Sequence, residues 1–272
     1  MPLLIFILLT LVPALWLLAA PLRIESRRRW LRSQPFPSAW RATLRERVPQ
    51  VRHLPADLQL QLKKHIQVFV AEKTFVGCGG LAVTDDMRVT IAAQACLLLL
   101  NRRTGYFPEL REILIYPAAF AVRRIRTDAA GVVHEGPAVH LGESSSRGQV
   151  VLSWDDVLRG AADAFDGHNV VIHEFAHQLD QENGEANGAP PLTGRRRVER
   201  WTRVFDDAFA RLRMQIADPA GPVLDPYGAS SPAEFFAVAS EAFFERPQHL
   251  ADAFPDLFDE LRSFYRVNPL SW

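Results

Sequence analysis

Residues 170–180 read Val170-Val-Ile-His-Glu-Phe-Ala-His-Gln-Leu-Asp180, and this segment indicates both the fold and the chemistry expected of the chain. His173 and His177 are four residues apart, so on a helix they lie one turn apart on the same face. Two neutral imidazoles placed in this way can bind one zinc ion. Glu174 follows the first histidine and can take a proton from a water that zinc activates, then pass it to a leaving amine. The segment therefore has the HExxH pattern of zinc peptidases.

The alternative is a core helix in which both histidines are satisfied by ordinary hydrogen bonds. Apolar residues before and within the motif, such as Ile172 and Phe175, fit a buried helix in either case. A core helix has no need to place His, Glu and His together on an otherwise apolar surface. The zinc site is therefore the preferred interpretation.

A catalytic zinc site needs a third protein ligand and one open position. The residues that directly follow His177 offer no third histidine, so the ligand must lie further along the chain. In the apolar helix expected within residues 225–245, Glu234 and Glu241 are seven residues apart and share a face. Either carboxylate needs a partner if it is buried. Glu234 also fits a capping box that begins at Ser231, and spacing alone does not choose between the two glutamates.

Several segments together resemble the Mlc titration factor A family of bacterial zinc metallopeptidases. They are residues 115–118, 150–154, 171–180, 183–184, 225–227, 232–238 and 262–269. The resemblance implies the zinc ligands His173, His177 and Glu234. It also implies Glu174 as the general base and Tyr227 as the group that stabilises the oxyanion, a role that suits a neutral phenol donor.

The same resemblance implies Zn²⁺ as the cofactor, a peptide or protein substrate, and aminopeptidase-like cleavage of short substrates. It further implies a catalytic core similar to that of anthrax lethal factor. The family is known for sequestering a glucose-responsive transcriptional repressor, so the alternative function is a membrane-tethered binding module for such a repressor. A purely structural zinc is disfavoured, because structural sites are closed by four protein ligands.

The fold class expected is α+β, a mostly helical zincin-like metallopeptidase domain with a small sheet, preceded by an N-terminal transmembrane helix. The expected domains are an anchor over residues 1–22, an Arg- and Pro-rich juxtamembrane linker over 23–54, and the metallopeptidase domain over 55–272. Periodicity predicts a helix over 57–72 and a second over 87–100, capped by Thr84. Short strands are expected at 112–116, 118–125, 132–133 and 149–154, the last as an edge strand along the cleft, with helices from residue 155 onward.

Residues 1–22 carry no charged side chain, and the next stretch holds several arginines against the single Glu25. A helix of about 20 residues rises about 30 Å, the thickness of a bilayer core. Positive charge after the span favours a cytoplasmic location for the remainder of the chain. We therefore expect a single-pass inner-membrane anchor with the catalytic domain in the cytoplasm. The alternative is a cleaved secretory signal ending near Ala19 and Ala20, although no Lys or Arg precedes the apolar run.

Composition excludes several other classes of protein. The chain has 272 residues, of which 48% are hydrophobic and 23% charged, as in ordinary globular domains. Its 31 basic residues equal its 31 acidic residues, which argues against direct nucleic-acid binding. Cys78 and Cys96 lack a CxxC spacing and are too few for a disulfide scaffold, so we expect free thiols.

Overall fold

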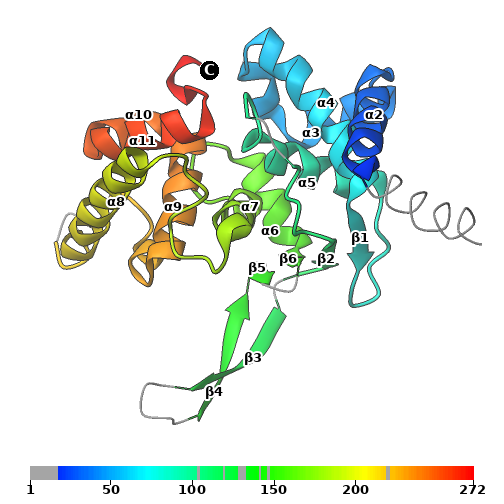
Figure 1. Ribbon diagram of the computed structural model, residues 1–272. Coiled ribbons are helices and arrows are strands. Elements are labelled where there is room, and N and C mark those ends of the chain that lie inside the picture. The colour runs from blue at the N-terminus through cyan, green and yellow to red at the C-terminus, as the bar shows by residue number, and fades with distance from the viewer. Residues whose placement is uncertain are drawn as a thin grey trace, which may run out of the picture.

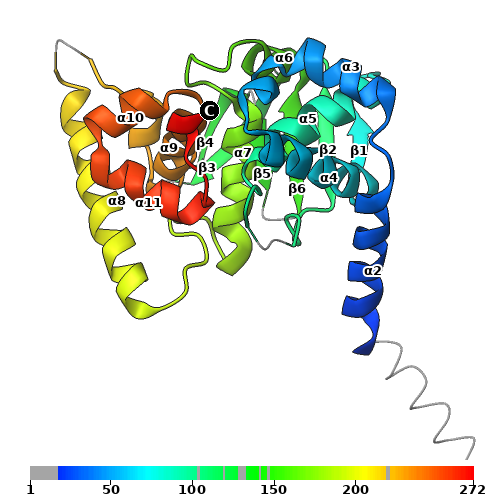
Figure 2. The same ribbon diagram turned by 90° about the horizontal axis from the view of Figure 1, so that it is seen from above.

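Helix α7 (Val170–Asp180), which carries the HExxH motif, lies centrally in the computed structural model (Figure 1). The structure describes residues 18–102, 105–118, 120–127, 133–140, 142–145, 148–218 and 221–272. On one side of α7 lie the N-terminal helices and the small sheet (Figure 2). On its other side lie α8 (Arg195–Gln215), α9 (Pro232–Glu245), α10 (Pro247–Ala253) and α11 (Pro255–Tyr265). The expected mostly helical α+β architecture is thus confirmed.

The main sheet has the strand order β1-β2-β6-β5. Strands β1 (Thr74–Gly77), β2 (Glu112–Tyr116) and β6 (Gln149–Ser153) are parallel, and β5 (Gly142–Ser145) pairs with β6 in the antiparallel direction. The prediction that residues 149–154 form an edge strand is wrong, because β6 lies between β2 and β5, and Trp154 already begins α6 (Trp154–Ala162). The edge of the sheet beside β6 is formed instead by β5, which lies in a Gly- and Ser-rich stretch.

Gly148 precedes β6 in a conformation that only glycine adopts readily. Its φ is +76°, and an added Cβ would lie 2.6 Å from the carbonyl oxygen of Glu109. Strands β3 (Phe120–Thr127) and β4 (Val133–His140) form a separate antiparallel hairpin that projects from the body of the protein (Figure 1). The strand expected at 118–125 corresponds to β3. Of the strand expected at 132–133, Val133 begins β4, and residue 132 lies outside the described residues.

Two helices packed together build the core beside the sheet. Helices α4 (Ala56–Glu72) and α5 (Asp85–Leu97) match the periodicity of the sequence, and the Thr84 hydroxyl accepts a hydrogen bond from the Met87 N–H at 3.3 Å. Leu62, Ile66 and Ile91 are fully buried where these helices meet the rest of the domain. Their burial gives this half of the protein a continuous hydrophobic core.

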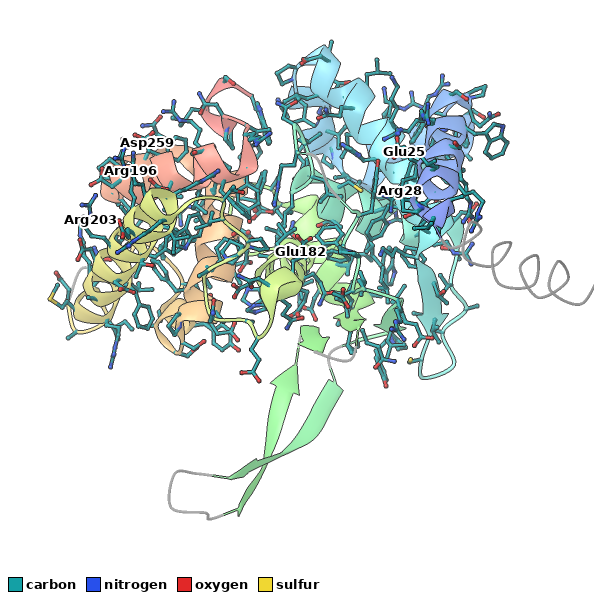
Figure 3. The ribbon with its side chains drawn as sticks, in the orientation of Figure 1. Glu25, Arg28, Glu182, Arg196, Arg203 and Asp259 are labelled. Atoms are coloured by element: carbon teal, nitrogen blue, oxygen red, sulfur yellow. The ribbon has the colours of Figure 1, made fainter. Side chains whose placement is uncertain are left out.

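Residues 23–54, expected as a linker, form helices that pack on the domain. Helix α2 (Ala20–Ser33) binds α4 through Arg28, labelled in Figure 3, whose guanidinium lies 2.8 Å from both carboxylate oxygens of Glu72. Helix α3 (Ser38–Arg47) and the turn η1 (Pro49–His53) follow, and Leu44, Val48 and Val51 are buried in the core. This part of the chain therefore contributes to the packing of the domain.

The expected anchor falls largely on residues 1–17, which lie outside the described residues. Among the helices of the part that is described, none combines the length and apolar character needed to cross a membrane.

Candidate metal centre

Helix α7 begins at Asn169, a buried residue that sequence reasoning missed. Its side-chain oxygen accepts hydrogen bonds from the N–H groups of Val171 at 3.1 Å and Ile172 at 3.0 Å, which caps the helix. Its side-chain amide donates to three acceptors on α5, α6 and α9: Gln94 Oε1 at 2.8 Å, Gly160 O at 3.2 Å and Glu245 Oε1 at 2.8 Å. The start of the motif helix is thereby fixed to three neighbouring helices.

Three side-chain atoms from α7 and α9 converge on one point. His173 Nε2 lies 2.9 Å from Glu234 Oε2, His177 Nε2 lies 3.2 Å from the same oxygen, and the two Nε2 atoms are 3.2 Å apart. Tetrahedral ligands about 2.0–2.1 Å from a zinc ion are about 3.3–3.4 Å from one another. The triangle of donor atoms is therefore only slightly smaller than zinc requires.

The second glutamate, Glu241, contacts the other ring nitrogen of His173. Its Oε1 lies 2.7 Å from His173 Nδ1, and its Oε2 accepts a hydrogen bond from the Asn169 N–H at 2.5 Å. Glu241 therefore holds the ring of His173 in place, while Glu234 supplies the third candidate ligand. The structure thus distinguishes the two glutamates, which sequence spacing did not.

The protonation pattern tests whether a cation fits this group. An ionised carboxylate only accepts hydrogen bonds, so we assign the proton of the neutral His173 ring to Nδ1, facing Glu241. Nε2 of His173 then presents a lone pair to the Glu234 carboxylate and to His177. The lone pairs of His173 Nε2 and the Glu234 carboxylate, 2.9 Å apart, repel unless a proton or a metal ion lies between them. The donor set of two imidazoles and one carboxylate suits a divalent ion of the zinc type.

The electrostatics of the group also favour positive charge at its centre. Burial alone would lower the pKa of His173, but the carboxylates of Glu241 and Glu234 outweigh it and hold the pKa well above its usual range. Burial would raise the pKa of Glu234, yet its contacts with His173 and His177 lower it strongly. The anionic form of Glu234 is therefore the one that the site stabilises.

Glu234 lies in the first turn of α9. The Ser231 hydroxyl accepts a hydrogen bond from the Glu234 N–H at 3.2 Å, and Pro232 occupies the first helical turn, so Ser231 caps the helix. The Glu234 side chain, which a capping box would turn back to the Ser231 N–H, instead contacts His173 and His177. Capping and metal binding are compatible because the first uses the backbone of Glu234 and the second its side chain.

Tyr227 is brought to the same site by the turn η3 (Pro226–Ala229). Its ring centroid lies 6.0 Å from that of His173, and 56% of the residue is exposed. The Asp225 carboxylate accepts a hydrogen bond from the Tyr227 N–H at 2.8 Å, which fixes the turn. Glu174 is buried on α7, between the two histidines in sequence. The five residues implied by the family resemblance thus come from α7, η3 and the start of α9.

Asp180 orders the loop after α7. Its Oδ2 accepts a hydrogen bond from the Gly188 N–H at 2.7 Å. Gly188 has a φ of +80°, and an added Cβ would lie 2.5 Å from the carbonyl oxygen of Pro232. The loop therefore passes closely against the start of α9, and Asp180 helps to place the helix that carries Glu234.

Comparison with known proteins identifies the family of the chain. Residues 22–266 match the family described as glucose-regulated metallo-peptidase M90. The protein slr2042 of Synechocystis sp. is 40% identical over 265 residues, covering 97% of this chain and 96% of the relative. Mlc titration factor A of Edwardsiella ictaluri is 35% identical over 88% of this chain and 89% of its own length, and that of Klebsiella pneumoniae is 36% identical over 82% and 84%. The chain therefore belongs to the M90 family of glucose-regulated metallopeptidases, also represented by Mlc titration factor A.

Proposed function

We propose that this protein is a zinc-dependent peptidase whose ligands are His173, His177 and Glu234. The observation that carries the proposal is the convergence of three lone-pair donors, 2.9–3.2 Å apart, beside a buried glutamate on the same helix. Membership of a metallopeptidase family supports the hydrolytic chemistry. Three protein ligands also leave a tetrahedral site with one open position, as catalytic rather than structural zinc requires.

Glu174 and Tyr227 have separate roles in the proposed hydrolysis. When bound, zinc would act as a Lewis acid that polarises the scissile carbonyl and makes water more acidic. Glu174 takes a proton from the attacking water as its oxygen bonds to the carbonyl carbon, and then delivers that proton to the leaving nitrogen as the C–N bond breaks. Tyr227 donates a hydrogen bond to the oxyanion that develops, which its exposed position beside His173 allows.

The substitution Glu174→Gln tests the assignment. The variant keeps all three candidate ligands but lacks a base, so it should retain zinc in metal analysis and lose nearly all hydrolysis of a peptide substrate. Glu182→Gln, the same change in the turn η2 (Gln181–Asn183) directly after α7, is the matched control and should keep its activity. Unchanged peptide hydrolysis by Glu174→Gln would contradict the mechanism.

Preference for a free amino terminus is a finer part of the proposal, and it comes from the family resemblance. Peptides with free and N-acetylated termini but otherwise identical sequences test it directly. An aminopeptidase should cleave only the free form, whereas equal cleavage of both forms would identify an endopeptidase.

We also propose that residues 1–22 anchor the protein in the inner membrane, with the catalytic domain in the cytoplasm. The absence of charge from residues 1–22 and the arginines of α2 support this arrangement. Membrane fractionation of the full chain, followed by protease treatment of intact spheroplasts, tests it. Recovery of a shortened protein in the soluble periplasmic fraction would favour the cleaved signal instead.

The second candidate function is binding of a transcriptional repressor. It is favoured by the name of two relatives, Mlc titration factor A, which refers to titration of Mlc. In this alternative the protein sequesters a related repressor, and peptide hydrolysis is secondary. A Glu174→Gln protein that still relieves repression in cells would support the binding function, and loss of that effect would support the catalytic one.

A further inference from the structure

The turn η3, which carries Tyr227, rests on α9 through Gly228. A Cβ added to Gly228 would lie 3.2 Å from the Val238 side chain and 3.3 Å from that of Leu212, so the backbone of the turn lies directly against α9 and α8. Val238 follows Glu234 by about one helical turn. This contact therefore sets the distance of the turn from the helix that carries Glu234, but it does not fix the turn relative to α7.

Asp225 connects the turn to a second part of the chain. Its Oδ1 accepts a hydrogen bond from the Tyr227 N–H at 2.8 Å, and its backbone carbonyl accepts one from the Gly228 N–H at 3.0 Å. The other carboxylate oxygen, Oδ2, lies 3.3 Å from His168 Nδ1. An ionised carboxylate offers only acceptors, so this contact is attractive when Nδ1 carries its proton.

His168 lies at the start of the motif helix. It directly precedes Asn169, which caps α7, and its own N–H donates a hydrogen bond to Asp166 Oδ1 at 2.8 Å. The backbone of His168 is thereby fixed on both sides. Its contact with Asp225 therefore joins the turn η3 to the helix that carries both candidate histidine ligands.

A cavity of about 380 Å³ lies beside this contact. Its lining comes from the loops 166–168 and 222–226 and from one side of α9, and it includes both His168 and Asp225. The two loops therefore do not rest on apolar packing across this space. The contact between His168 and Asp225 bridges it.

We propose that His168 and Asp225 are positioning residues that hold Tyr227 beside the candidate metal centre. The inference rests on the proposed function, in which the Tyr227 phenol donates a hydrogen bond to the oxyanion. Such a donor must already be in place when charge develops, because a displacement of about 1 Å can lower the rate severely. Tyr227 is 56% exposed, so packing supports its ring little, and the place of the ring beside His173 depends on the turn.

Hydrogen exchange of the zinc-free, full-length protein tests the positioning without any reference to catalysis. His168→Leu removes the donor but keeps a branched side chain, so the amides of Tyr227 and Gly228 should exchange at least threefold faster. The amides of α7 and the Tm should stay unchanged, because the side chains of His168 and Asp225 are 62% and 32% exposed and such pairs add little to global stability. Unchanged exchange at Tyr227 in His168→Leu would overturn the proposal.

Three further variants sharpen the exchange test. Asp225→Ala should accelerate exchange at Tyr227 at least as much as His168→Leu, because it also removes the acceptor of the Tyr227 N–H. His168→Asn should restore slow exchange, since its amide nitrogen is bonded to Cγ as Nδ1 is in histidine. His249→Leu, the same change at an exposed histidine of α10, is the matched control and should leave exchange at Tyr227 unaltered.

Kinetics of the zinc-loaded protein separate a positioning role from a general structural one. With the peptide substrate used for Glu174→Gln, Tyr227→Phe should lower kcat at least tenfold. His168→Leu should lower kcat about fivefold, with KM and zinc affinity within twofold of the unsubstituted protein. In the Tyr227→Phe background, His168→Leu should lower kcat no further, because the group that His168 positions is already gone.

Two kinetic outcomes would overturn the proposal. A full further loss of kcat in the double variant would show that His168 does not act through Tyr227. Loss of zinc affinity in His168→Leu would show that it acts on α7 instead. Failure of the unsubstituted, zinc-loaded protein to hydrolyse peptides would contradict the proposed function, and the exchange measurement would still decide whether His168 and Asp225 hold the turn.

Discussion

Replacement of Glu241 by Gln should weaken zinc binding although Glu241 is not itself a candidate ligand. In the structure this residue has two hydrogen-bond donors to satisfy, since it accepts from His173 Nδ1 at 2.7 Å and from the Asn169 N–H at 2.5 Å. Gln has one acceptor oxygen, and its amide group would oppose one of these donors. The substitution therefore removes the negative charge behind His173 and also leaves one hydrogen bond unmade.

The size of the effect follows from these contacts. Hydrogen bonds to charged groups contribute about 1.5–3 kcal/mol, and Glu241 is only 6% exposed, so water compensates little. Since about 1.4 kcal/mol corresponds to a factor of ten, zinc affinity should fall about 10- to 100-fold. Glu245→Gln is the matched control on the same helix, because its carboxyl group is already protonated near neutral pH.

Competition with a chromophoric chelator at pH 7.5 measures the zinc affinities of both variants. Thermal unfolding of the zinc-free proteins shows whether each variant is folded. A Glu241→Gln protein that is folded and binds zinc within twofold of the unsubstituted protein would refute the argument that Glu241 positions His173.

Three further predictions concern stability. Zinc should raise the Tm, and a chelator should reverse the increase. At a free zinc concentration about a thousand times Kd, the free energy of unfolding should increase by about 4 kcal/mol. His173→Ala should show no change in Tm with zinc. Folding raises the pKa of Glu245 from 4.5 to about 9, so the free energy of unfolding should decrease as pH rises from about 5 to 9; urea titrations should show a smaller decrease in Glu245→Gln. Gly188→Ala should cost more than about 1 kcal/mol in the same titrations, and more than Gly80→Ala, because both glycines have φ near +80° but only an added Cβ at Gly188 meets Pro232.

The parts of the fold that follow from local pattern were predictable from the sequence. Helix α4 and the capped α5 follow from hydrophobic spacing and from Thr84, and β2 follows from its apolar run. The candidate site was also accessible, since HExxH places His173 and His177 on one helix face. The choice of Glu234 over Glu241 required the family resemblance, because spacing puts both on one face of the helix. In the structure Glu234 contacts Nε2 of both histidines, whereas Glu241 contacts Nδ1 of His173.

The remaining features depend on long-range packing. The pairing of β5 with β6 depends on a turn at Gly148, and sequence patterning did not show that this Gly- and Ser-rich stretch would form the edge of the sheet. The burial of Leu44 and Val48 was hidden by the arginines and prolines around them, which indicated a linker. For Asn169, its position before an apolar helix was a signal for a cap, but its contacts on α5, α6 and α9 lie 9–76 residues away in sequence.

The residue that starts α7 also limits which replacements the protein tolerates. On an isolated helix Asp would serve as well as Asn at this position, because a start needs only an acceptor oxygen. Here the buried side-chain amide of Asn169 must also donate hydrogen bonds to Gln94 and Glu245. Hydrolysis of this amide to a carboxyl group would place a third acid beside Glu241 and Glu245. Deamidation of Asn169 would therefore disturb the helix that carries both histidines.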